Sequence, residues 1–230
     1  MAQADEAERL KLLDEIRSHN EERYELMTRA LKLSGVEDAH KFITKGLPQS
    51  QLFMVEVIPF LHRLYLHEEE NTTKRVLDVG PQNFAGTALL RDVHRRNSFN
   101  RLKLDVSAVD IVDGFDLLRE IVAPGLPFLK SDVFKIKDQT WDTIICSHVV
   151  EHVPKPGQFL ARLQDLAHDF VIVGCPWNED PITTKSHINT INKQSIIEFG
   201  GRDLQIFTNY CWGKHREVCL FWLPGKAKTA

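Results

Sequence analysis

The 230-residue sequence lacks the features that mark several common protein classes. It has four cysteines but no CxxC pair, which argues against a zinc knuckle or an iron–sulfur site. No apolar run approaches the length of about 20 residues that a membrane span requires. The net charge is only -3, so the chain has no overall attraction to nucleic acid or to an anionic membrane. Internal repeats and low-complexity tracts are also missing, and we expect an ordinary globular protein.

The first residues of the sequence do not resemble a secretion signal. The segment MAQADEAERLKLLDE is charged and has no apolar core of the kind found in signal peptides. Cys146 and Cys175 lie in apolar, strand-like runs, which is typical of buried and reduced thiols. These observations favour a cytoplasmic protein.

The chain divides into two parts of different texture, residues 1–70 and residues 71–230. The first part carries two apolar stripes at helical spacing, namely Leu10, Leu13, Ile16 and Tyr24, Met27, Leu31. Gly35 is a helix stop, and residues 68–71 form a charged linker. A buried helix is expected over residues 51–66, kinked or restarted at Pro59. We expect this helical segment to cover the active site.

The second part alternates between short apolar runs and amphipathic stretches. Strands are predicted at residues 75–79, 104–110, 128–134, 143–147 and 170–174, with helices at 86–96 and 157–166. A final antiparallel pair, at 204–211 and 217–223, flanks Gly213. Alternating strands and helices imply a parallel sheet with right-handed crossovers. The expected fold is α/β, with a mostly parallel seven-stranded sheet, helices on both faces, an antiparallel C-terminal strand and an N-terminal helical extension.

A glycine-containing turn follows the first predicted strand directly. RVLDV runs into Gly80-Pro81-Gln82-Asn83-Phe84-Ala85-Gly86 and then into a helix. In an open α/β sheet, ligands bind outside the carboxyl ends of the strands, and a glycine turn lets the backbone approach them closely. The N–H groups of the following helix point at the same place. The sequence therefore predicts a ligand site at this turn.

Aspartates lie at three neighbouring strand ends. Asp78 suits a cationic amine, bound directly or through water, and Asp110 suits the two hydroxyls of a ribose. Asp132 can accept a hydrogen bond from an exocyclic adenine amine, with Val133 packed near the ring. Each aspartate alone is as readily a helix cap or a turn former, but their recurrence at successive strand ends favours a ligand.

Four segments within residues 74–175 together resemble the class I S-adenosylmethionine-dependent methyltransferases. They are VLDVG, SAVD, KSDVF and WDTIICSHVVEHVPKP, and the last is typical of the branch that methylates small molecules and sugars. The resemblance implies a Rossmann-like fold and S-adenosyl-L-methionine as the cofactor. It puts Gly80 under the methionine part, Asp110 at the ribose, Asp132 and Val133 at the adenine, and Ser147 and His148 at the sulfonium end. The expected cofactor-binding set is Asp78, Gly80, Pro81, Gln82, Asp110, Ile111, Asp132, Val133, Ser147 and His148.

The turn departs from the pattern of this family. The family loop carries further glycines, as in DxGxGxG, whereas this chain has Gln82 and Phe84 there and its next glycine is Gly86. Either the loop follows a wider path or the pocket is altered. A non-catalytic, methyltransferase-like binding or regulatory protein is therefore an alternative.

Two further functions fit the sequence less well. A dinucleotide-binding enzyme needs a GxGxxG turn, which this chain lacks. The pyrophosphate of a dinucleotide would also be repelled by Asp78. A nucleic-acid or protein methyltransferase that acts on amino groups would carry Asn-Pro-Pro-Tyr or Asp-Pro-Pro-Tyr after the fourth strand. This chain has Ser147-His148-Val149-Val150 instead.

Histidine is the natural base for methyl transfer to a hydroxyl at neutral pH. The candidates are His152, His148 and His187, and His152 beside Glu151 is preferred, although a structural role in the loop is equally open. The three imidazoles could ligate a metal, but no HExxH motif or tight ligand spacing is present, so no metal site is expected.

The loop after the fifth strand is expected to overhang the acceptor pocket, unless it is a surface turn. Trp177, Asn178 and Glu179 offer a stacking plane and hydrogen-bonding groups there. The prediction is a methyltransferase for a small polar acceptor, with a sugar or glycan hydroxyl suggested. Nucleic acid and membrane are not expected as partners, and a homodimer is left open.

Overall fold

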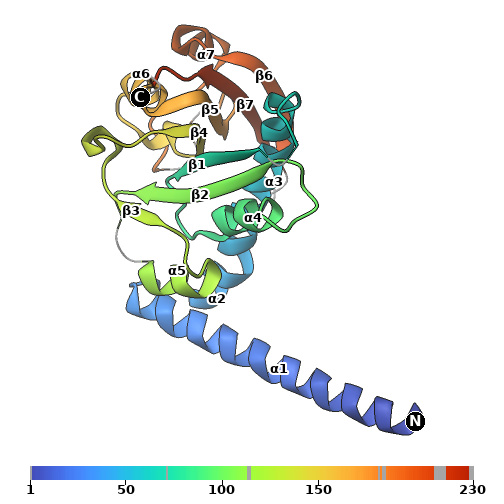
Figure 1. Cartoon of the computed structure of the whole chain (residues 1–230). Coiled ribbons are helices and arrows are strands. Elements are labelled where there is room, and N and C mark those ends of the chain that lie inside the picture. The colour runs from blue at the N-terminus through green and yellow to red at the C-terminus, as the bar shows by residue number, and fades with distance from the viewer. Residues whose placement is uncertain are drawn as a thin grey trace.

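The computed structural model describes residues 2–70, 72–112, 115–180, 182, 185–209 and 216–227. A sheet lies at the centre of the molecule, helices cover both of its faces, and a long N-terminal helix extends away from the body (Figure 1). The seven strands have the order β3-β2-β1-β4-β5-β7-β6 across the sheet. In chain order they are β1 Thr73–Val79, β2 Lys103–Asp110, β3 Phe128–Lys130, β4 Trp141–Ser147, β5 Ala167–Pro176, β6 Arg202–Asn209 and β7 Arg216–Pro224.

The pairing of the strands brings their carboxyl ends to one edge. Strands β1 to β5 pair in parallel, whereas β7 is antiparallel to both β5 and β6. Val79, the last residue of β1, pairs with Val109 of β2 and with Cys146 of β4. The segments that leave these three strands therefore start side by side, which is where ligands bind in sheets of this kind.

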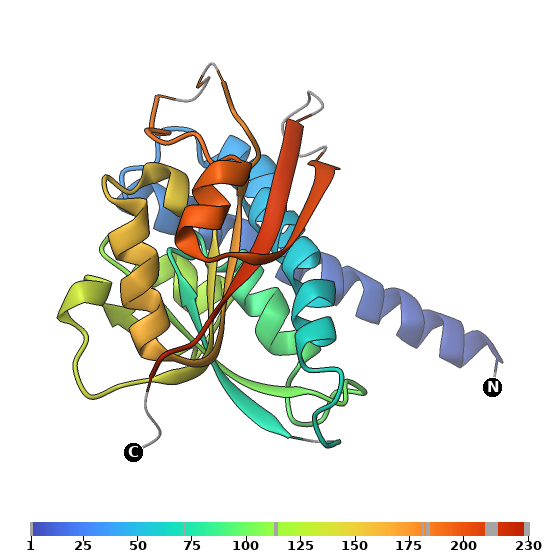
Figure 2. The same cartoon turned by 90° about the horizontal axis from the view of Figure 1, so that it is seen from above.

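Two helical layers enclose the sheet (Figure 2). Successive residues of β1 pack into the cores on opposite faces of the sheet. Val76 packs with α3 and α4, whereas Leu77 packs with α6 and α7. Burial on both faces explains why the central strands are almost wholly apolar. The helices are α1 Ala2–Leu33, α2 Ala39–Lys41, α3 Leu47–Leu64, α4 Ala85–Val93, α5 Asp116–Val122, α6 Pro156–Leu166 and α7 Lys193–Phe199. Short helical turns of other kinds are η1 Phe42–Gly46, η2 Val133–Lys135 and η3 Val150–His152.

The N-terminal part is helical, as its apolar spacing predicts. Helix α1 ends before Gly35, which has a φ of 78° and is followed by a bond from the Val36 N–H to the Leu31 carbonyl. Leu31 is buried against α5, but the earlier stripe of α1 is not, since Leu10 is 53% exposed. Helix α3 continues through Pro59 and does not restart there.

The sheet confirms the predicted strands, with small differences at their ends. The third strand is shorter than predicted, because Asp132 caps the turn η2 directly after it. The last predicted hairpin is present, but Cys211 and Gly213 lie outside the described residues. Helices α5 and α7 are additions that periodicity did not indicate. No helix in the described part of the chain combines the length and apolar character needed to cross a membrane.

Candidate functional site

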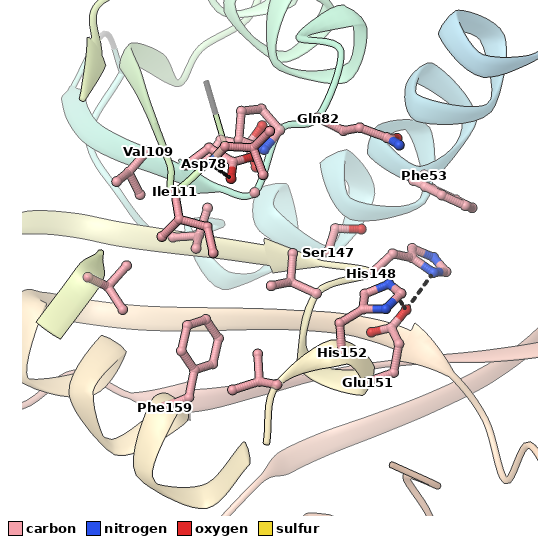
Figure 3. Close-up of a pocket in the computed structure, with 18 of the residues that line it drawn as sticks. Phe53, Asp78, Gln82, Val109, Ile111, Ser147, His148, Glu151, His152 and Phe159 are labelled. Carbon is pink, nitrogen blue, oxygen red and sulfur yellow. Dashed lines mark hydrogen bonds and ion pairs between the residues drawn. The ribbon is translucent and has the colours of Figure 1, made fainter. Parts of the chain in front are cut away.

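A cavity of about 860 Å³ opens at the carboxyl edge of the sheet. Its walls come from the segments after β1, β2, β3 and β4, from the loop after β5 and from one side of α3 (Figure 3). This volume is in the range of roughly 300–1,000 Å³ found for small-molecule sites. All of the residues that the sequence predicts for cofactor binding and for the base border this one cavity. They are Asp78, Gly80, Pro81, Gln82, Asp110, Ile111, Asp132, Val133, Ser147, His148, His152 and His187.

The turn after β1 keeps left-handed backbone where the sequence has too few glycines. Gln82 has a φ of 50° and Phe84 a φ of 62°, values that glycine adopts without strain. Gly80, with a φ of 72°, has no room for a side chain, because a Cβ atom would lie 2.6 Å from Cγ2 of Val149. The turn thus has glycine-like geometry at Gln82 and Phe84, and contacts with neighbouring residues offset the backbone strain.

Those contacts come largely from the N-terminal helices. The buried Asn83 donates from Nδ2 to the Gly46 carbonyl at 3.0 Å and accepts the Ala85 N–H at Oδ1. The Gly86 N–H donates to Oγ of Ser50 at 3.2 Å, and a Cβ at Gly86 would meet the Ser50 carbonyl. The start of α3 therefore braces the turn as well as lining the cavity.

Asp78 is the most deeply buried of the three aspartates at the sheet edge. Thr87 donates from Oγ1 to its Oδ2 at 2.5 Å. Burial raises the pKa of Asp78 to about 6, with the Thr87 hydrogen bond opposing the rise and the charge of Asp110 adding to it. A carboxylate that is so costly to ionise is well placed to gain from a cationic ligand.

Asp110 and Asp132 each cap their own turn and also border the cavity. Oδ1 of Asp110 accepts the Val112 N–H, and Oδ1 of Asp132 accepts the Phe134 N–H, both at 3.0 Å. The capping role and the ligand role that the sequence left open are thus compatible. Each hydrogen bond holds the carboxylate at the cavity wall and is accepted by its Oδ1.

The segment after β4 turns sharply into the cavity. His148 has a φ of 55°, and its N–H donates to the Gly174 carbonyl at 2.7 Å. Its ring stacks on Phe53 of α3, with 3.6 Å between the ring centroids and 18° between the planes. Sequence reasoning missed Phe53, because it lies 95 positions away and reads as an ordinary apolar residue of α3.

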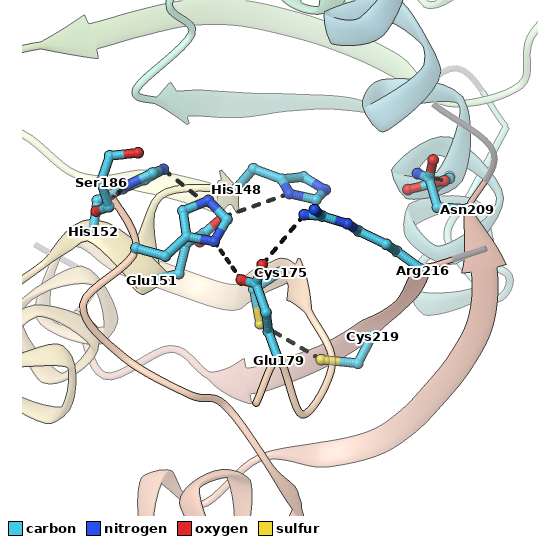
Figure 4. A network of polar contacts seen from close by, with 11 residues as sticks. His148, Glu151, His152, Cys175, Glu179, Ser186, Asn209, Arg216 and Cys219 are labelled. Atoms are coloured by element: carbon cyan, nitrogen blue, oxygen red, sulfur yellow. Dashed lines mark hydrogen bonds and ion pairs between the residues drawn. The ribbon is translucent and has the colours of Figure 1, made fainter. Parts of the chain in front are cut away.

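Glu151 is buried between two of the candidate histidines (Figure 4). Its Oε1 lies 3.5 Å from Nδ1 of His148 and 3.9 Å from Nε2 of His152. Burial of a carboxylate that is only 1% exposed costs free energy, which indicates a specific role for Glu151. Its position beside His152 was the only signal that the sequence offered.

His152 and His187 are each held through Nδ1. His152 Nδ1 donates to the Ser186 carbonyl at 2.8 Å, and His187 Nδ1 bonds to Oε2 of Glu179 at 2.5 Å. Glu179 also pairs with Nη1 of Arg216 at 3.2 Å. The two imidazole rings meet edge to face, with centroids 4.8 Å apart.

The loop after β5 reaches the cavity through residues other than those expected. Ser186 and His187 border it, whereas Trp177, Asn178 and Glu179 are absent from its wall. Trp177 packs against the hydrophobic core instead, since its ring is more stable there than in water, and Glu179 supports His187 from behind. The expected stacking plane for an acceptor is therefore not at Trp177.

The fold is that of class I methyltransferases. Magnesium protoporphyrin IX methyltransferase from Synechocystis PCC 6803, with bound SAH, has a TM-score of 0.57 at 13% identity, over 77% of this chain and 84% of that one. The 1,6-didemethyltoxoflavin-N1-methyltransferase of Burkholderia thailandensis, with S-adenosylhomocysteine bound, has a TM-score of 0.54 at 19% identity, over 76% and 79%.

The same architecture also serves a different chemistry. The [4+2]-cyclase SpnF has a TM-score of 0.53 at 7% identity, over 75% of this chain and 81% of that one. No protein-family model matches the sequence, and no curated protein matches it in sequence. The likeness thus establishes the fold, and function must be argued from the site.

Proposed function

We propose that this chain is a methyltransferase that uses S-adenosyl-L-methionine and acts on a small polar acceptor. The observation that carries the proposal is the cavity at the sheet edge, where Asp78, Asp110 and Asp132 meet a glycine-like turn. Neighbours of the same fold that hold SAM or SAH add support. The cofactor, when bound, supplies a methyl group that is already activated as a sulfonium.

The proposed cofactor residues suit the chemistry of this ligand. Asp78 attracts the ammonium group, and Asp110 accepts the ribose hydroxyls. Asp132 accepts from the adenine amine beside Val133. Gly80 has no side chain, so the ligand can approach its backbone closely. Ser147 and His148 border the sulfonium end. Pro81, Gln82 and Ile111 complete the proposed set.

The acceptor is proposed to bind between α3 and the histidines. The stacked rings of Phe53 and His148 line this end of the cavity, and residues 1–70 cover this side through α3. His152 is the preferred base, with His148 and His187 as alternatives. Because its Nδ1 donates to a carbonyl, Nε2 of His152 carries the lone pair that can accept a proton. A sugar or glycan hydroxyl is one acceptor class that this arrangement suits.

The proposal also includes a reducing, cytoplasmic location. The described cysteines Cys146, Cys175 and Cys219 are buried free thiols, which supports this part of the proposal.

Calorimetry with S-adenosylhomocysteine tests the proposal directly. We expect binding of one equivalent with a micromolar or tighter dissociation constant. Absence of heat at millimolar ligand would instead favour the non-catalytic alternative. A methyl-transfer screen over small polar acceptors then addresses the acceptor class.

A further inference from the structure

Three side chains at the acceptor end of the cavity form a cluster with metal-ligand chemistry. Glu151, His152 and His187 each offer one ligand atom, and these atoms all lie within 4.8 Å of one another. They come from η3 and from the loop after β5, so the fold and not a sequence motif brings them together.

The hydrogen bonds of the two histidines leave the same nitrogen for a ligand. The Ser186 carbonyl can only accept, so His152 carries its proton on Nδ1 and has its lone pair on Nε2. Glu179 is an acceptor for His187 in the same way, and Arg216 pairs with that carboxylate at 3.2 Å. A carboxylate or carbonyl behind each imidazole is the usual support of a metal-bound histidine.

Glu151 supplies the charge that two neutral imidazoles lack. Neither of its carboxylate oxygens accepts a hydrogen bond within the described part of the chain, although both are buried. Its nearest possible cations are the imidazoles of His148 and His152, at 3.5 and 3.9 Å, and a buried carboxylate held by no hydrogen bond is rare and calls for an explanation. A cation between Glu151 and the two histidines would satisfy it.

We propose that Glu151, His152 and His187 bind one divalent transition-metal ion such as Zn²⁺. Two imidazoles and a carboxylate suit this class of ion, and they leave coordination positions open to the cavity. Ligand atoms that share a tetrahedral zinc ion lie about 3.4 Å apart, so the cluster needs a closure of about 1 Å. The side chain of His152 is 38% exposed and has room to move.

The role of the ion rests on the proposed function, whereas its binding does not. All three residues border the cavity, so the ion would face the acceptor. It would lower the pKa of an acceptor hydroxyl bound beside it. His152 and His187 then act as ligands in the loaded protein, and the need for a histidine base is removed.

Titration of Co²⁺ into chelator-treated, untagged protein tests the proposal. We expect one equivalent to bind with visible d–d absorption, and Zn²⁺ to displace it. Glu151→Gln and His187→Ala are each expected to weaken binding by at least about 100-fold, and Glu179→Gln by about 10–100-fold through its support of His187. The matched control His67→Ala removes an exposed surface histidine and should change nothing.

Two results would overturn the proposal. The first is that the wild-type protein takes up neither Co²⁺ nor Zn²⁺. This result can be interpreted without any variant. The other is unchanged uptake in Glu151→Gln and His187→Ala. Circular dichroism reports the folding of each variant, and calorimetry with S-adenosylhomocysteine on the same samples separates failure of the metal site from failure of the proposed cofactor site.

Discussion

The carboxylates at the sheet edge differ in their surroundings although they lie at equivalent strand ends. Asp78 is buried against Thr87, whereas Asp110 is partly exposed and caps its own turn. Burial raises the pKa of the first toward neutrality, whereas the second accepts a backbone N–H at the cavity wall. Their contributions to ligand binding can be separated by substitution.

Replacement of Asp110 tests the ribose contact. Asp110→Ala should weaken S-adenosylhomocysteine binding by about 1–3 kcal/mol, because the ligand hydroxyls lose a charged acceptor. Calorimetry measures the change, with Asp105→Ala on the same strand but outside the cavity as control. Equal affinity in wild type and Asp110→Ala would remove this residue from the site.

The raised pKa of Asp78 predicts a pH dependence of affinity. With the pKa at about 6, the ionised form that attracts an ammonium group dominates above that pH and is lost below it. Affinity for S-adenosylhomocysteine should fall about tenfold between about pH 7.5 and about pH 5. Asp78→Asn should bind weakly with a flat pH profile. A steep profile in that variant would assign the titration to another group.

The same shift predicts the opposite effect on stability. Folding raises the pKa of Asp78 above its usual value, so this group stabilises the fold below about pH 4 and loses that contribution as the pH rises through about 6. Asp78→Asn should therefore raise the melting temperature at neutral pH, as measured by thermal unfolding. A lower melting temperature would mean that the Thr87 hydrogen bond outweighs the burial cost.

The role of His152 is tested by separating turnover from binding. His152→Ala should lower kcat by about 10²–10⁴-fold, because either a base or a metal ligand is lost. Affinity for S-adenosylhomocysteine should stay within about twofold of wild type, since His152 lies outside the proposed cofactor set. Near-normal turnover would shift the role to His148 or His187.

At the scale of elements, the turn after β1 depends on α3. Gln82 and Phe84 hold left-handed backbone, and Asn83 and Gly86 fasten the turn to residues of the N-terminal part. Glycine would adopt the backbone of Gln82 and Phe84 without strain. Here tertiary contacts stabilise the geometry.

Two substitutions in this turn should shift stability in opposite directions. Gln82→Gly should raise the free energy of unfolding by up to about 1 kcal/mol, because the exposed Gln82 is strained at its positive φ. Gly80→Ala should lower it by more than about 1 kcal/mol, since the new Cβ meets Val149. Denaturant unfolding measures both. Loss of stability in Gln82→Gly would show that glycine's backbone entropy outweighs the relief of strain.

At the scale of the whole molecule, the first half of α1 lies away from the body (Figure 1). Its apolar stripe, Leu10, Leu13 and Ile16, is exposed, and the contacts of α1 with the fold begin near Arg23 and include the buried Leu31. We therefore expect the fold and the cavity not to depend on this half. Helix α3, by contrast, supplies Met54, Val57 and Phe60 to a central core.

Truncation tests this division. Deletion of residues 1–20 should change the melting temperature by less than about 2 °C and leave S-adenosylhomocysteine binding intact. Deletion of residues 1–66 should abolish folding, because one face of the sheet loses its cover. Circular dichroism and calorimetry measure both. A large loss in the shorter deletion would give the exposed stripe a structural role.

Local sequence patterns determine most of this fold. Apolar runs buried on both faces predict the central strands, and the ends of these runs identify Asp78, Asp110 and Asp132 as neighbours at one edge. Both signals are local, because the burial of a strand and the direction in which it runs can be recognised from a few consecutive residues. The helices α5 and α7 are only seven residues each, too short for a clear periodic pattern.

The tertiary structure alone decided how distant side chains meet. The stacking of Phe53 on His148, the exposure of the α1 stripe and the packing of Trp177 into the core depend on contacts between separate elements. The cluster of Glu151 with His152 and His187 joins two loops in the same way. Such contacts carry no periodic trace in the sequence, because they depend on the relative placement of whole elements and not on neighbours along the chain.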